Sequence, residues 1–318
     1  MLKELLARRV VVLLGKGGVG KSSLSAALAL AASRRGAHTL VMECDSRAPI
    51  ASLYGIEPVF EPTEAVGFNL MVLDGRHTLE EYLRIVVPGR LLLKAVFSSR
   101  LYQFFVQAAP GLRELMALGK IYYETERKPG DDRRWDLIIV DAPASGQALS
   151  WLKMPTAARA TFGDSIVGKE ANNITGMLTD RERCAIVQVT TADSLAVSET
   201  IETFDDLDKL ELTPAAIFFN RYVKLSFSED DADALAKRRV AREQKKAIEH
   251  LGEIARAELR RNSESAAALA QVQHKAGDIV IEIPEHRGLF GTTLVDALAD
   301  DLNAVPARSR SRRAAVKR

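Results

Sequence analysis

Gly15–Ser22 carries the residue types that a phosphate-binding loop needs. The segment reads GKGGVGKS and satisfies the pattern G-x-x-x-x-G-K-[ST]. Its glycines permit a tight loop whose backbone N–H groups point at a triphosphate, and the helix expected after it adds a positive N-terminal end. Lys21 is expected to contact the β- and γ-phosphates, and the Ser22 hydroxyl to ligate Mg²⁺. The loop therefore predicts a site for ATP and Mg²⁺, with cofactor contacts from Gly15, Gly17, Gly18, Val19, Gly20, Lys21, Ser22 and Ser23.

The segment Trp135–Pro155 supplies a carboxylate for the same site. An apolar run ends there at Asp141 and is followed by APASG. Because a phosphate loop lies upstream, we interpret Asp141 as a Walker-B-type metal residue that holds Mg²⁺ through water, rather than as an ordinary turn residue. Pro143 stiffens the turn. Gly146 has no side chain, so its backbone N–H can approach the γ-phosphate.

A second lysine, Lys16, stands one residue after the first glycine, too near the loop entry to take the role of Lys21 in its own site. It can instead reach another subunit and place a cation on the phosphates in trans, as an arginine finger does. The run KGGVGKS is the signature of the deviant Walker A ATPases. Trp135–Pro155 resembles the switch D-A-P-x-[ST]-G-x-x-L-x-x-L-x-x-P of their ArsA group, the anion-transporting and tail-anchored-protein-targeting ATPases. The chain resembles this group from Val10 to Leu302, and its bacterial, actinobacterial-type members most.

The resemblance implies roles for three further residues. It places Asp45 where the family has the carboxylate that orients the attacking water, so Lys16, Lys21 and Asp45 are the catalytic candidates. It places Asn220 and Pro284 beside the adenine ring, although Asn220 could instead cap its own loop. Glu43 is a competing carboxylate, but a strand residue is more often packed or paired.

Short apolar runs that alternate with helix-like stretches must position these residues. The runs are almost continuously apolar, which indicates strands buried on both faces of a parallel sheet. The prediction is an α/β P-loop NTPase fold: a mostly parallel, doubly wound sheet of about seven or eight strands, with helices on both faces and a helical insertion. We expect strands at Arg9–Leu14, Thr39–Glu43, Phe68–Leu73, Asp136–Val140, Ala185–Thr190, Ala215–Phe219 and Asp278–Ile283.

Residues 1–305 are interpreted as a single ATPase domain with two additions. The segment 78–128 is too long for one crossover helix and predicts a helical insertion. Within it, Ala109–Glu124 resembles a segment of the bacterial members, and one helical face there could pack on the sheet or receive a client. The segment 229–275 is densely charged and predicts a long exposed helix or a helix pair. The tail 306–318 is basic and expected to be disordered.

Composition excludes several classes of protein. The chain of 318 residues has a net charge of only +2, so it carries no strong signal for nucleic-acid binding. No apolar segment approaches the roughly 18 residues of a transmembrane helix, and a cytoplasmic protein is expected. Its two cysteines, Cys44 and Cys184, are too few for a Cys₄ zinc site or for a multi-thiolate arsenite site. The five histidines show no metal-ligand spacing.

These features predict a dimeric, Mg-ATP-dependent ATPase switch, which hydrolyses ATP to ADP and phosphate and couples the resulting movement to a cargo. The dimer partner is a second copy or a paralogous ArsA-like subunit, and the cargo is an unidentified hydrophobic ligand or protein client. Two alternatives stay open. One is a nucleotide-binding subunit with little turnover of its own, and the other is a ParA- or MinD-like positioning ATPase that acts through the basic tail.

Overall fold

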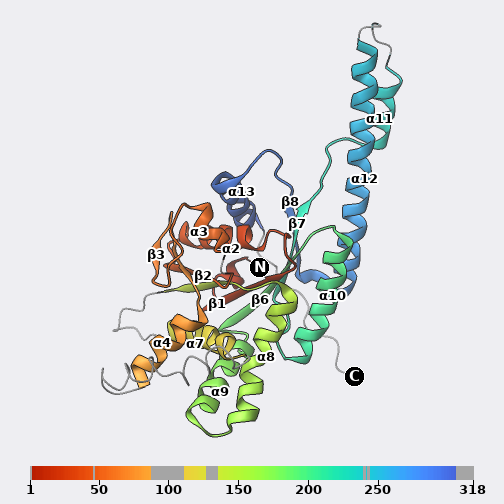
Figure 1. Cartoon of the computed structure of the whole chain (residues 1–318). Coiled ribbons are helices and arrows are strands. Elements are labelled where there is room, and N and C mark those ends of the chain that lie inside the picture. The colour runs from red at the N-terminus through yellow and green to blue at the C-terminus, as the bar shows by residue number, and fades with distance from the viewer. Residues whose placement is uncertain are drawn as a thin grey trace.

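The computed structural model describes residues 2–45, 47–86, 111–126, 135–238, 241 and 244–305. Within these ranges, eight strands form one sheet in the order β3-β4-β2-β5-β1-β6-β7-β8 (Figure 1). All neighbouring strands are parallel except β3 and β4. The strands are β1 (Val10–Gly15), β2 (Thr39–Glu43), β3 (Thr63–Glu64), β4 (Asn69–Val72), β5 (Leu137–Asp141), β6 (Cys184–Thr190), β7 (Ala216–Tyr222) and β8 (Val280–Pro284).

Helices cover both faces of this sheet, so the predicted doubly wound architecture is confirmed (Figure 1). The described helices are α1 (Leu2–Leu5), α2 (Lys21–Ser33), α3 (Pro49–Leu53), α4 (Gly75–Val86), α7 (Leu112–Glu126), α8 (Ser145–Phe162), α9 (Ile166–Thr179), α10 (Ser194–Lys209), α11 (Glu229–Ala236), α12 (Lys245–Ala276) and α13 (Gly291–Ala304), with a 3₁₀ turn at Gly277–Ile279.

The apolar runs are buried on both sides, as expected for central parallel strands. Along β1, Val11 and Leu13 enter the core beneath α2, whereas Val10, Val12 and Leu14 enter the opposite core with α7, α8 and α9. Helix α2 is rich in alanine, and its residues 26–32 are almost completely buried. Small side chains therefore let this helix pack closely between the sheet and α13.

The strands differ from the predicted ones mainly at their ends. The expected strand at 278–283 begins only at Val280, because the chain forms a 3₁₀ turn immediately before it. The strand expected to end at Phe219 continues to Tyr222 through an irregularity in its pairing with β8. The strand β3 was not predicted: it has two residues, and it pairs antiparallel at the sheet edge, where no buried apolar run is needed.

The charged segment 229–275 contains the helices α11 and α12. Helices α11 and α12 pack together and project beyond the rest of the molecule (Figure 1). Leu251 of α12 is 49% exposed, and the buried residues of this helix lie mostly nearer the sheet, at Gly252, Ser265, Ala268, Leu269 and Val272. The long insertion contains α4 and α7; its residues 87–110 and 127–128 lie outside the described ranges, as does the basic tail.

Candidate nucleotide site

The phosphate loop joins β1 to α2 at the carboxyl edge of the sheet. Its last residue, Gly20, has φ 91°, and a Cβ atom there would lie 2.4 Å from Nδ2 of Asn220. At the other end, a Cβ on Gly15 would lie 2.6 Å from the carbonyl oxygen of Val189. Only glycine fits these two positions. Gly20 has a left-handed backbone conformation, and at both Gly15 and Gly20 a side chain would clash with atoms from another segment of the same chain. Val19 is buried between them, and Gly17, Gly18 and Ser23 complete the loop and the first turn of α2.

Lys21, Ser22 and Asp141, which the sequence assigns to the phosphates and Mg²⁺, lie together at the carboxyl edge of the sheet. The Asp141 carboxylate is fully buried and accepts hydrogen bonds from Nζ of Lys21 at 2.7 Å and Oγ of Ser22 at 2.6 Å. They meet because β1 and β5 are adjacent parallel strands, whose carboxyl ends share one edge. A serine hydroxyl and a carboxylate are the hard oxygen donors that Mg²⁺ prefers, so these side chains fit the predicted ion.

Sequence reasoning missed Ser25 at this site. Its hydroxyl is buried and donates to Oδ1 of Asp141 at 3.1 Å. Ser25 lies one helical turn after Lys21 and Ser22 on α2, so helical spacing alone would have placed it on the same face. Together the three donors hold the aspartate in one orientation.

Lys16 lies apart from this cluster in the described chain. Its Nζ contacts Oδ1 of Asp193 at 3.2 Å, and the Lys16 side chain is 31% exposed. Asp193 is also the N-cap of α10 and accepts a hydrogen bond from the amide of Ala196. Both contacts lower the pKa of Asp193. The hydrogen bond from the Ala196 amide has the larger effect, and the one from Lys16 has the next largest. Lys16 thus forms an ion pair with Asp193 of its own chain.

Asp45 is likewise held by a neighbouring charge. Its carboxylate accepts hydrogen bonds from the Arg47 guanidinium, at 2.6 Å for the closest pair, and these bonds lower the pKa of Asp45. Asp45 follows β2, whose end is paired with β5 at Glu43 and Asp141. The segment that carries Asp45 therefore leaves the sheet beside Asp141, the metal-binding candidate.

Glu43 fastens the loop that carries Asp45. It is fully buried at the end of β2 and accepts hydrogen bonds from the amides of Ile50 at 2.6 Å and Ala51 at 3.0 Å, in α3. Burial raises the pKa of Glu43 to about 7, although these two amides oppose the shift; the nearby Asp141 charge adds to it and Lys21 opposes it. As expected for a strand residue, Glu43 is paired rather than free.

This raised pKa predicts a pH-dependent stability. The folded protein holds the Glu43 proton more tightly than the unfolded chain, whose ordinary pKa is 4.5, so the free energy of unfolding should fall as pH rises from about 4.5 to 7. Glu43→Gln removes that titration. Denaturant unfolding should therefore show the variant gaining stability relative to wild type between pH 5 and pH 8. If the difference in the free energy of unfolding between Glu43→Gln and wild type stayed constant across this pH range, the raised pKa of Glu43 would be contradicted.

The residues predicted for the adenine end lie across the sheet from Asp45. Asn220 is buried near the end of β7; its Nδ2 donates to the carbonyl of Val19 at 2.8 Å, and its Oδ1 accepts the amide of Arg221 at 3.0 Å. The side chain thus braces the phosphate loop, and contact with a base stays a prediction. Pro284 ends β8 and pairs with Tyr222. Gly146 is the second residue of α8, and open space surrounds its missing side chain.

Both cysteines are free, and burial raises the pKa of both thiols, that of Cys184 to about 12. Within the described ranges, no group of three or more His, Cys, Asp or Glu residues is placed to hold a metal ion. No described helix is both long and apolar enough to cross a membrane.

Comparisons with known proteins match the part of the chain that carries the phosphate loop and Asp141. A family model described as anion-transporting ATPase matches residues 8–177, from the strand before the phosphate loop to α9. The chain is 28% identical over 231 residues to ATPase BagA of Mycobacterium tuberculosis, an alignment that covers 70% of this chain and 68% of that protein. It is 25% identical over 143 residues to ATPase ASNA1 homolog 1 of Paramecium tetraurelia, covering 44% of this chain and 42% of the relative.

Proposed function

This chain belongs to the anion-transporting ATPase family and hydrolyses ATP, and from that premise we propose that it is a Mg-ATP-dependent switch that works as a dimer. The observation that carries the proposal is the convergence of Lys21, Ser22 and Asp141 behind a glycine loop. Ser22 and Asp141 would hold Mg²⁺, which supplies neutralisation of phosphate charge when bound. Lys21 would then move from Asp141 to the β- and γ-phosphates.

Lys16 would act on the nucleotide of the partner subunit. Its position at the loop entry and its partly exposed side chain suit a reach across an interface. The pairing of Lys16 with Asp193 must break before this reach, and Asp45 must likewise leave Arg47 to orient water. Two catalytic candidates are therefore engaged within the isolated chain, which favours slow turnover until a second copy or a paralogous subunit binds.

Hydrolysis would reach the helices through α8. This helix begins four residues after Asp141, and Oγ of Ser145 in its first turn donates to Glu199 of α10. Further along α8, the indole Nε1 of Trp151 donates to the carbonyl of Glu114 in α7 at 3.0 Å. A change in the loop after Asp141 would thus shift a rigid helix that is fastened to both α10 and α7.

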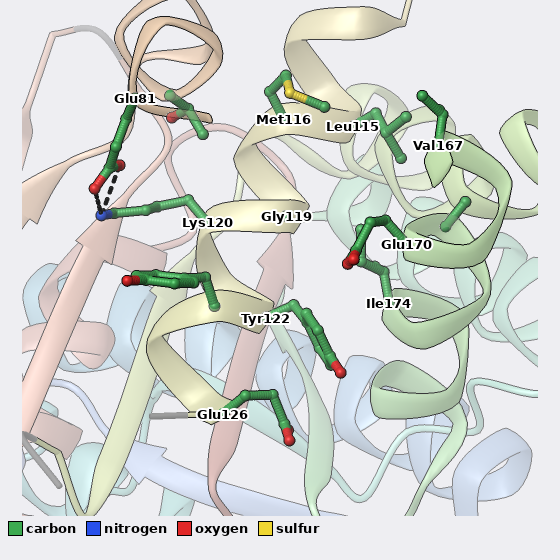
Figure 2. Close-up of a pocket in the computed structure, with 13 residues that line it drawn as sticks. Glu81, Leu115, Met116, Gly119, Lys120, Tyr122, Glu126, Val167, Glu170 and Ile174 are labelled. Carbon is green, nitrogen blue, oxygen red and sulfur yellow. Dashed lines mark hydrogen bonds and ion pairs between the residues drawn. The ribbon is translucent and has the colours of Figure 1, made fainter. Parts of the chain in front are cut away.

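A cavity between α7 and α9 is our candidate for the cargo site. It has a volume of about 300 Å³. Figure 2 shows Met116, Gly119 and Tyr122 on α7 facing Val167 and Ile174 on α9. Most of its wall is apolar, as in sites for small hydrophobic ligands or side chains. Part of the α7 face that the sequence left undecided therefore lines a hollow, while Leu115 also enters the core.

Filling this cavity should weaken binding of an apolar ligand. The missing side chain of Gly119 points to Ile174, with 4.0 Å between the Cβ position and Cδ1, so Gly119→Leu adds bulk inside. We expect at least about tenfold weaker binding of N-phenyl-1-naphthylamine, a neutral fluorescent probe. Gly176→Leu on α9 is the control, because open space surrounds that glycine. Equal affinity of the probe for wild type and both variants would exclude the cavity as its site.

The dimeric switch is tested by measuring the ATPase rate and the molecular mass in solution over a range of protein concentrations. Each measurement is made with Mg²⁺ and with EDTA. We expect turnover per chain to rise as dimers form, and to require Mg²⁺. If this chain alone stays slow while adding a paralogous subunit restores turnover, the partner is the paralogue. Constant turnover by a monomer would refute the dimeric switch.

A further inference from the structure

Strand β7 contains a bulge at Asn220 and Arg221. Its pairing with β8 shifts between Phe219 and Tyr222, and Arg221 has φ 58°. A non-glycine residue rarely takes this left-handed conformation, and bulges near sites often redirect a side chain. The bulge interrupts the regular pairing of the strand, so sheet formation alone does not account for it.

Hydrogen bonds on both sides fix the bulge against the phosphate loop. The Asn220 side chain links the amide of Arg221 to the carbonyl of Val19. After the bulge, the carbonyl of Tyr222 accepts the amide of Glu285 at 3.0 Å. These bonds fix the backbone of Arg221 between the phosphate loop and the loop after β8.

The guanidinium of Arg221 lies next to the phosphate loop. Its Nη2 is 4.0 Å from the position that a Cβ atom would take on Gly20. Arg221 is exposed, and within the described ranges its guanidinium has no hydrogen-bond or ion-pair partner. Two nearby arginines differ in this respect, since Arg261 and Arg287 are both paired with Glu258 and Glu285. A cation without an anion beside a phosphate loop suits an anionic ligand.

The order of the strands indicates which end of the nucleotide Arg221 meets. The strands β2 and β5, which carry Asp45 and Asp141 at their ends, lie on one side of β1. The strand β7 lies on the other side, beyond β6, and β8 with Pro284 follows it. Arg221 therefore approaches the phosphate loop from the side of β7 and β8, opposite to the strands that carry Asp45 and Asp141 and toward the predicted nucleoside end.

We propose that Arg221 is a nucleotide-binding residue that contacts the α-phosphate of a bound adenine nucleotide. The inference rests on the proposed ATP site and adds a contact that ATP and ADP share. Such a contact binds substrate and transition state equally, so it affects affinity and leaves the chemical step unchanged. In this respect Arg221 differs from Lys16 and Asp45.

The test compares Arg221→Ala, Arg221→Gly and Arg221→Lys with wild type for ADP affinity by calorimetry and for kcat and KM with ATP. Alanine and glycine should weaken ADP binding about tenfold to a hundredfold and raise KM by the same factor at unchanged kcat, and lysine should recover part of the loss. Glycine matters because it tolerates φ 58° and keeps the bulge folded. The charge-matched control is Arg256→Ala, on the exposed surface of α12.

Two results would overturn the proposal. One is unchanged ADP affinity in the alanine and glycine variants while wild type binds ADP. The other is a fall in kcat at constant KM, which would place Arg221 at the terminal phosphoryl group instead. If wild type itself neither bound ADP nor hydrolysed ATP, the proposed function would fail first, and the two failures are thereby distinguished.

Discussion

Replacing Lys16 by alanine is expected to lower kcat by about 10³-fold or more while Mg-ATP still binds, the scale of losing a cation supplied in trans. The terminal phosphoryl group gains negative charge in the transition state, and a lysine from the partner would stabilise that charge only there. ATP affinity should persist, because Lys21, Ser22 and the loop amides stay intact.

Single-turnover hydrolysis and equilibrium binding of ATP measure the two effects of Lys16→Ala separately. Lys169→Ala, an exposed lysine on α9, is the matched control and should hydrolyse ATP like wild type. If Lys16→Ala turned over ATP at the wild-type rate, Lys16 would have no catalytic role, and its contact with Asp193 would be a surface ion pair of little consequence.

The second large effect is expected from Asp45→Asn, which should reduce kcat by about 10²- to 10⁴-fold, the usual contribution of a positioned acid–base group. Asparagine keeps the size of the side chain but accepts no proton and orients water less well. While Asp45 is bonded to Arg47, those hydrogen bonds lower its pKa and keep its carboxylate charged at neutral pH. The variant should therefore bind ATP and hold it uncleaved.

Quench analysis of bound nucleotide after one hour would show ATP on Asp45→Asn and ADP on wild type. Asp164→Asn, at an exposed ion pair with Arg159, provides the control. Rapid cleavage by Asp45→Asn would exclude Asp45 as the water-orienting carboxylate and leave Glu43, at the end of β2, as the competing candidate.

The sequence was most informative where local chemistry leaves few choices. A glycine loop between an apolar run and a helix former determines where Lys21 and Ser22 lie, and parallel strands bring Asp141 to the same edge. Continuous apolar runs likewise indicated strands buried on both faces, and seven of the eight strands follow them. These inferences need only the pattern of the neighbouring residues.

Features that depend on contacts between distant segments were not predictable in this way. No local pattern marks the pairing of Lys16 with Asp193, 177 residues apart in the chain. The bulge that aims Arg221 at the phosphate loop arises from the register between β7 and β8. Asn220 is expected at the base from the sequence, whereas its bond to the Val19 carbonyl joins β7 to a phosphate loop that lies 201 residues away in the chain.

The most direct test of a lysine acting in trans is to mix Lys16→Ala with Asp45→Asn at concentrations where dimers form. In a mixed dimer, the Lys16→Ala subunit keeps Asp45 and receives Lys16 from its partner, so one complete site is rebuilt. We predict recovery to about a quarter of wild-type activity, because random pairing makes half of the dimers mixed and each contains one working site of two. Mixtures that contain mixed dimers and yet stay as inactive as either variant alone would contradict the account.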